Sequence, residues 1–170
     1  MHWEKFDRVQ GRTKFCEKIN VALSHYEGSF ELSPTGEVLR KAEFGFEPIF
    51  AAELPMSDDN VVGRVNAAVL RFRRHGATID DRRQAVRDLA DVLEYLRPKI
   101  QGLLVSKDEG DLFNIANNFG IRHHNDRQKT NYDASLWLNW MFYFYLSTMH
   151  VVIRKLAKAD GRATQPSPTP

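Results

Sequence analysis

The sequence predicts an all-α fold, an antiparallel helical bundle of about five helices with a small β-hairpin insertion and a disordered C-terminal tail. Three observations support it: apolar residues recur every three or four positions in several segments, a tight-turn sequence separates two short runs near Pro34, and the last residues are polar and proline-rich. Of the 170 residues, 42% are hydrophobic and 27% are charged, which is typical of a globular chain. We therefore expect a single domain over residues 1–158, with the hairpin at about 30–41, and a tail over 159–170.

The N-terminal part is predicted to hold one helix and the hairpin. Residues 13–26 have helical spacing of apolar side chains, and Gly28 follows as a stop. The apolar positions of this helix are Phe15, Cys16, Ile19, Leu23 and Tyr26. Pro34 and Gly36 lie where a hairpin turn needs them. Residues 42–55 contain glycine and prolines among aromatics, so we expect an irregular segment that packs on the core. Its core contacts are predicted to be Phe44, Phe46, Ile49 and Phe50.

Two helices with clear start signals are predicted next. Ser57, Asp58 and Asp59 can cap a helix that carries an apolar stripe through Phe72. Thr78 followed by Asp81 resembles a capping box for a third helix that runs toward Ile100, and Pro98 is expected to kink or interrupt that helix near Arg97. A fourth helix is predicted from about Ser106 to Phe119 and a fifth from Asp133 or Ala134 to about Ala157.

Charge and cysteine content favour a cytoplasmic protein. The formal net charge is only +2, so the overall field gives no strong indication of a nucleic-acid or membrane partner. The single cysteine, Cys16, excludes an internal disulfide, and the charged N-terminus does not resemble a signal peptide. Residues 136–153 contain no Asp, Glu, Lys or Arg and are long enough to approach a membrane span. However, a polar stripe shares one sector of this helix, which favours a buried bundle helix over a membrane helix. The stripe consists of Asn139, Tyr143, Ser147, His150, Arg154 and Lys158.

The segment "IRHHNDRQKTNYD", Ile121 to Asp133, is the candidate site. Metal-independent RNA cleavage needs an imidazole that takes the 2′-hydroxyl proton and a guanidinium that holds the phosphate. The candidate catalytic residues are therefore Arg122, His123, His124 and Asn125, and the candidate substrate-binding residues are Arg127, Lys129, Asn139 and Tyr143. Adjacent histidines on a helix diverge by about 100°, so we expect no metal site, and no cofactor is expected. The alternative is a structural polar seam, in which Arg122 pairs with Asp126 or Asp133 and the imidazoles bond to backbone carbonyls.

The C-terminal half resembles the HEPN superfamily of small helical domains. The resemblance covers roughly residues 80–157, and its sharper part is "DLFNIANNFGIRHHND" followed by "YDASLWLNWMFYFYLSTMH", which also resembles uncharacterised small bacterial proteins. It implies a metal-independent endoribonuclease of a toxin–antitoxin or phage-defence system that acts on RNA as a dimer. Of the family motif, Arg122 and the polar residue after it carry over. The histidine that follows a few residues later in the family has no counterpart, so His123 or His124 would act through a different geometry. The other hypothesis is a non-catalytic helical module that binds a protein partner, itself or nucleic acid.

Overall fold

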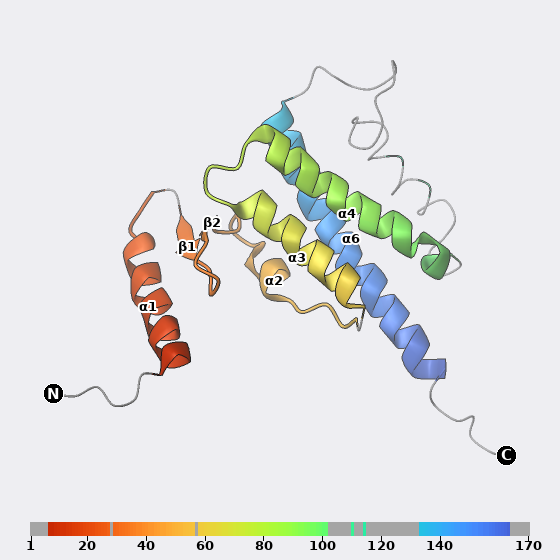
Figure 1. Ribbon diagram of the computed structural model, residues 1–170. Coiled ribbons are helices and arrows are strands. Elements are labelled where there is room, and N and C mark those ends of the chain that lie inside the picture. The colour runs from red at the N-terminus through yellow and green to blue at the C-terminus, as the bar shows by residue number, and fades with distance from the viewer. Residues whose placement is uncertain are drawn as a thin grey trace.

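The computed structural model describes residues 7–27, 29–56, 58–101, 110, 114 and 133–163. Its elements are α1 (Arg8–Leu23), β1 (Phe30–Leu32), β2 (Val38–Arg40), α2 (Glu47–Ala51), α3 (Asp59–Arg73), α4 (Ile79–Ile100) and α6 (Ala134–Ala163) (Figure 1). The predicted all-helical bundle with a small hairpin is confirmed. The predicted fourth helix lies outside the described residues, apart from Gly110 and Asn114, which are helical.

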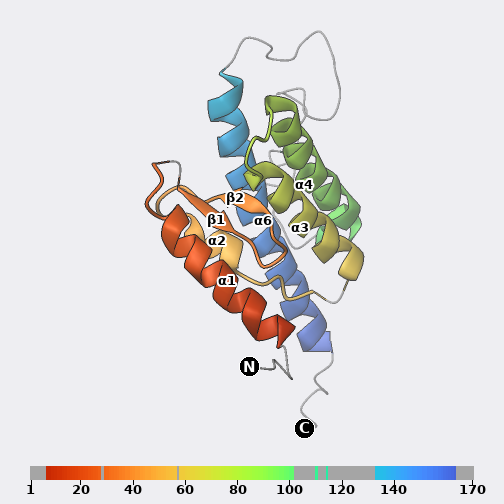
Figure 2. The ribbon, with the colours of Figure 1, turned by 60° about the vertical axis from the view of Figure 1, so that its left-hand side comes forward.

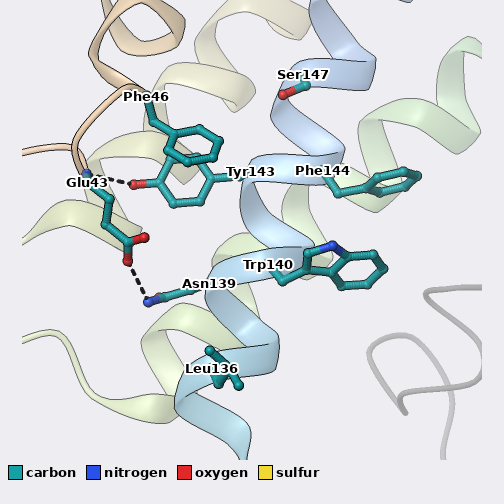
Figure 3. Close-up of a pocket in the computed structure, with 8 residues that line it drawn as sticks. All are labelled: Glu43, Phe46, Leu136, Asn139, Trp140, Tyr143, Phe144 and Ser147. Carbon is teal, nitrogen blue, oxygen red and sulfur yellow. Dashed lines mark hydrogen bonds between the residues drawn. The ribbon is translucent and has the colours of Figure 1, made fainter.

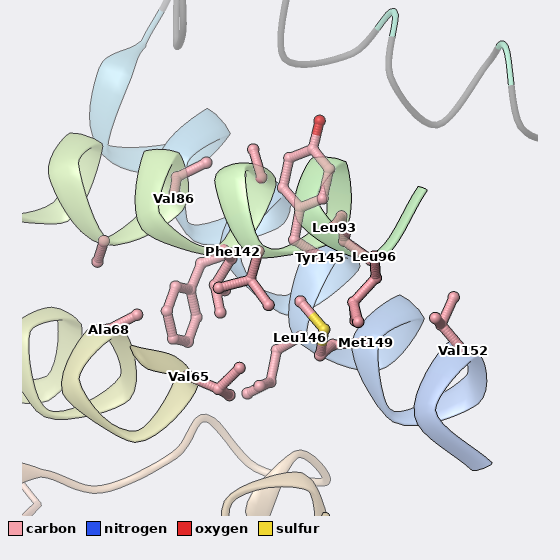
Figure 4. Packing of buried hydrophobic residues seen from close by; sticks show 14 of the residues in the cluster. Val65, Ala68, Val86, Leu93, Leu96, Phe142, Tyr145, Leu146, Met149 and Val152 are labelled. Atoms are coloured by element: carbon pink, nitrogen blue, oxygen red, sulfur yellow. The ribbon is translucent and has the colours of Figure 1, made fainter. Parts of the chain in front are cut away.

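The core lies between α3, α4 and α6. Helices α3 and α4 are joined by a short turn in which Gly76 has φ +77°, and they run in opposite directions (Figure 1). Helix α6 runs in the same direction as α4, since a hydrogen bond between Arg82 and Asn139 joins the N-terminal parts of the two helices (Figure 1). The apolar side chains of the three helices interdigitate (Figure 4). Phe142 on α6 is fully buried and stacks on Phe72 of α3, with ring centroids 3.7 Å apart and an interplanar angle of 4°.

Helices α3 and α4 begin where the sequence predicts. The Asp58 carboxylate accepts from the backbone N–H of Asn60 and Val61, which satisfies two of the free donors at the start of α3. Thr78 and Asp81 form the predicted capping box at the start of α4. Of the kink or interruption predicted near Arg97, the interruption is wrong, because α4 continues through Pro98 to Ile100.

Helix α1 differs from its prediction. It begins at Arg8 rather than residue 13, because the Asp7 carboxylate accepts from the backbone N–H of Gln10 and caps it. None of its residues is buried, and Phe15, expected to face the core, is 58% exposed. Helix α1 packs on the hairpin instead of joining the three-helix core (Figure 2). The Asn20 side chain clamps the hairpin edge, donating to Leu32 O at 3.1 Å and accepting from Leu32 N.

The hairpin is where the sequence predicts it. Strands β1 and β2 are antiparallel, with Phe30 opposite Arg40 and Leu32 opposite Val38, and Gly36 has φ +93° in the turn. Leu39 is the buried residue of β2. The backbone N–H of His75, just after α3, donates to Val38 O, so the hairpin is fixed to the end of α3.

The segment after the hairpin is partly helical, which corrects the prediction of an irregular segment. Residues Glu47–Ala51 form α2, with Pro48 in its first turn, where proline needs no N–H partner. Ile49 and Phe50 pack against the core as predicted, whereas Phe44 is 99% exposed and Phe46 is 42% exposed. The glycine between these two phenylalanines, Gly45, has φ +89°, so the chain turns there.

Helix α6 is longer than predicted. It continues past Ala157 to Ala163, so the first residues of the expected disordered tail are helical, and 164–170 lie outside the described residues. His150, part of the predicted polar stripe, is buried on this helix. Across the described residues, no helix is both long and apolar enough to span a membrane.

Candidate functional site

The described candidate site is centred on Arg82, in the second turn of α4. Its guanidinium lies over the Phe72 ring, with Cζ 5.6 Å from the ring centroid, and one terminal nitrogen donates to Asn139 Oδ1 at 3.3 Å. The Nε atom is buried and has no hydrogen-bond partner among the described residues. Within the described part of the chain, no carboxylate forms an ion pair with Arg82. Arg82 is therefore a half-buried cation whose charge is incompletely compensated.

A chain of hydrogen bonds connects Arg82 to the loop after the hairpin. Asn139 accepts from Arg82 and donates through Nδ2 to Glu43 Oε1 at 3.1 Å. The backbone N–H of Glu43 donates to the Tyr143 hydroxyl at 3.3 Å, one turn further along α6 (Figure 3). The Phe46 ring lies against the Tyr143 ring, with centroids 4.4 Å apart. These contacts hold the Glu43 loop against the first half of α6.

Further cations surround Arg82. A recess of about 40 Å³ is lined by Arg40, Lys41, Arg73 and Arg82, together with Glu43, Phe72, Asn139 and Tyr143. Arg73 is held in place: its Nε donates to Arg40 O at 3.0 Å, it pairs with Glu31 at 2.5 Å, and it lies over the Phe50 ring. The recess is therefore a cationic pocket with polar donors from three helices and the hairpin.

Burial and charge shift two pKa values in the same region. The pKa of Arg82 is lowered, mainly by burial and also by the positive charge of Arg40, while Glu43 acts in the opposite direction. The pKa of the Tyr143 hydroxyl is raised, mainly by burial. Tyr143 is therefore a neutral hydroxyl at physiological pH, able to donate a hydrogen bond to an anion.

An open groove continues from the recess along α6. It has a volume of about 440 Å³ and is lined mainly by apolar and aromatic side chains (Figure 3). These are Phe46, Leu136, Trp140, Tyr143 and Phe144, and the polar lining residues are Glu43, Asn139 and Ser147. Trp140 is 43% exposed and stacks on Phe144, with ring centroids 5.5 Å apart. Glu43, Asn139 and Tyr143 line both the recess and the groove, so the two cavities share a wall.

His150 does not belong to the site. It is buried on α6, where burial and the charge of Arg154 lower its pKa and a hydrogen bond to the backbone of Ile49 acts in the opposite direction. This contact joins α6 to α2, which is a structural role. Among the described residues, no group of three or more His, Cys, Asp and Glu side chains could hold a metal ion.

The structure brings together two of the eight predicted site residues, Asn139 and Tyr143. The other six lie outside the described residues: Arg122, His123, His124, Asn125, Arg127 and Lys129. The prediction did not include Glu43, Arg82 or the cations of the hairpin. One feature of the sequence could have indicated Arg82. A cation near the N-terminus of a helix is disfavoured by the helix dipole, so its presence there suggests a role other than stabilising the helix.

Comparison of the chain with protein-family models, with curated proteins and with solved structures gives no match.

Proposed function

We propose that this protein is a HEPN-like helical protein that binds RNA, and that Arg82 holds a backbone phosphate. The observation that carries the proposal is the state of Arg82: it is half-buried, it has an unpartnered buried Nε, and its positive neighbour Arg40 opposes its charge. Binding an anion in the recess would offset the repulsion between the two guanidinium groups of Arg82 and Arg40. Phosphate suits the site because a guanidinium presents paired donors to two of its oxygens.

The surrounding residues favour a phosphate that belongs to a larger molecule. The recess of about 40 Å³ is too small to enclose a whole phosphate, so the group would insert one or two oxygens and leave the rest outside. Arg40 and Lys41, at the end of β2, add positive charge at the rim, and neighbouring phosphates of a nucleic acid would use it. The aromatic side chains of the adjoining groove are the kind of surface on which unpaired bases stack. These features together support single-stranded RNA rather than a small carboxylate.

RNA cleavage is a separate proposal that depends on "IRHHND". Arg122 would clamp the phosphate, and His123 or His124 would act as general acid and base, in the manner that the HEPN resemblance implies. Arg82 would then position the strand and take no part in bond breaking. A helical module that binds RNA without cutting it is the alternative.

One set of measurements tests both proposals. Fluorescence anisotropy with a labelled single-stranded RNA in EDTA compares wild type, Arg82→Gln and the control Arg83→Gln. Arg83 is next to Arg82 in the chain but pairs with Asp80 at the surface. We expect Arg82→Gln to weaken binding at least about tenfold, as the loss of a charge-assisted hydrogen bond implies, and Arg83→Gln to stay within about twofold. Equal affinity of Arg82→Gln and wild type would contradict the phosphate site.

The same RNA is then followed on a denaturing gel. Cleavage by wild type that is lost in both Arg122→Ala and His124→Ala would support a ribonuclease. Intact RNA after incubation with freshly purified wild type would exclude it and leave RNA binding as the function.

A further inference from the structure

We infer that the aromatic groove beside Arg82 binds a nucleobase and prefers guanine, with Glu43 reading the edge of the base. This inference rests on the proposed function, because it adds base recognition to the same RNA-binding site. It follows from the shared wall of the two cavities: Glu43, Asn139 and Tyr143 line both the cationic recess and the groove. A nucleotide whose phosphate reaches Arg82 can therefore place its base in the groove.

The groove has the shape and chemistry that a base needs. Its volume of about 440 Å³ exceeds that of one base, and it lies in the range of small-molecule sites, which are mostly apolar with a few convergent polar groups. Trp140 and Phe46 are each more than 40% exposed, so aromatic surface is present at the groove. Stacking on such rings strengthens binding but does not depend strongly on which base is bound. Selectivity must therefore come from the polar groups.

Glu43 is the polar group that distinguishes the bases. Its Oε1 accepts from Asn139 Nδ2 at 3.1 Å, while its backbone N–H is held by the Tyr143 hydroxyl, so both ends of the residue are fixed. The second carboxylate oxygen points toward the groove (Figure 3). Asn139 is itself oriented by Arg82, which donates to its Oδ1. The site thus places the Glu43 carboxylate, which can only accept hydrogen bonds, beside the aromatic side chains of the groove.

Guanine fits this acceptor better than the other bases. Its Watson–Crick edge offers two neighbouring donors, the ring N1–H and the exocyclic N2–H₂, to the free Oε2 of Glu43 and to the lone pair of Oε1 that Asn139 does not use. Adenine and cytosine each offer one donor beside an acceptor nitrogen, which a carboxylate repels. Uracil offers one N–H between two carbonyl oxygens, which is less favourable still. The expected order of affinity therefore places guanine first.

The test uses two labelled RNA 12-mers of matched length, one repeating UUGU and the other repeating UUAU. We expect wild type to bind the guanine probe about tenfold more tightly, equivalent to about 1.4 kcal/mol, within the range for one bidentate base contact. Glu43→Gln should reduce that ratio to within about twofold, because an amide supplies only one acceptor and its N–H₂ opposes the guanine donors. The matched control is Glu53→Gln, which removes the same charge from an exposed position and should retain the preference. Circular dichroism of each variant checks that the fold is intact.

The outcomes separate this inference from the proposed function. Equal affinity of wild type for the two probes, or a guanine preference that survives Glu43→Gln, would overturn the base-reading role and leave RNA binding standing. Failure of wild type to bind either probe would overturn both. A preference lost in Glu43→Gln, together with weaker binding of both probes by Arg82→Gln, would support both.

Discussion

The stack of Phe72 on Phe142 joins α3 to α6 and thereby sets Asn139 and Tyr143 against Arg82. Phe142 is fully buried and Phe72 is 9% exposed, with ring centroids 3.7 Å apart. Replacing either phenylalanine by leucine removes about 1–2 kcal/mol of transfer free energy. Loss of the ring pair adds about 0.5–1.5 kcal/mol. We therefore expect each single variant to lower the free energy of unfolding by about 1.5–3.5 kcal/mol.

A double-mutant cycle isolates the stack. Urea unfolding followed by circular dichroism gives the free energies of wild type, Phe72→Leu, Phe142→Leu and the double variant. The ring pair can be lost only once, so the double variant should be less destabilised than the two singles together, by about 1 kcal/mol. As a control, Leu156→Ala lies about 20 Å further along α6 and should be additive with Phe72→Leu. A coupling energy below about 0.3 kcal/mol for the phenylalanine pair would refute the stacked geometry.

Three other predictions concern stability. Burial and the charge of Arg154 lower the pKa of His150 below its usual 6.5. As pH falls, the imidazole of the unfolded chain is therefore protonated before that of the folded chain. The free energy of unfolding should consequently decrease as pH drops below about 6.5. Urea midpoints at about pH 7.5 and about pH 5.5 should therefore differ less in His150→Gln than in wild type, whereas the exposed control His75→Gln should keep the wild-type difference. Thr78→Ala removes the capping box of α4 and should cost about 0.5–2 kcal/mol in urea unfolding; an unchanged midpoint would contradict the cap. Asn20→Ala removes the side-chain hydrogen bonds that hold α1 to the hairpin, so limited trypsin digestion should cleave within α1 faster than in wild type. Global stability should change little, because no residue of α1 is buried.

Local signals predicted most of the described fold. The caps at Asp58 and Thr78 and the hairpin turn at Gly36 depend on neighbouring residues alone, and each lies where the sequence placed it. The helical stripes of α3, α4 and α6 were readable because burial on one face imposes a period of 3.6 residues.

The helices whose bounds were predicted wrongly have few such local signals. The start of α1 was predicted too late because the helix packs only on the hairpin and needs no continuous apolar face. The cap at Asp7 was then the sole sequence signal for its first turn. Helix α2 is five residues long, too short to display a period. The end of α6 was set too early because polar residues after Ala157 resemble a tail, although they continue the helix.

The candidate site could be predicted only in part because it depends on contacts between distant segments. Asn139 and Tyr143 were found from the polar stripe that they share on one helix. Their partner Glu43 lies 96 residues from Asn139 in the chain, and nothing in its surrounding sequence indicates the contact. Arg82 is preceded by Asp80 and Asp81, which made it resemble an ordinary charged helix start.

The salt dependence of RNA binding tests the central claim most directly, because phosphate contacts release counterions and base contacts do not. Association constants for a single-stranded RNA are measured over a series of salt concentrations for wild type, Arg82→Gln and Arg83→Gln. If Arg82 holds one phosphate, its loss should reduce the slope of log K against log salt by about 0.7, the value for one contact with a single strand. Arg83→Gln should keep the wild-type slope. The same slope in Arg82→Gln as in wild type would contradict the claim that Arg82 binds the RNA backbone.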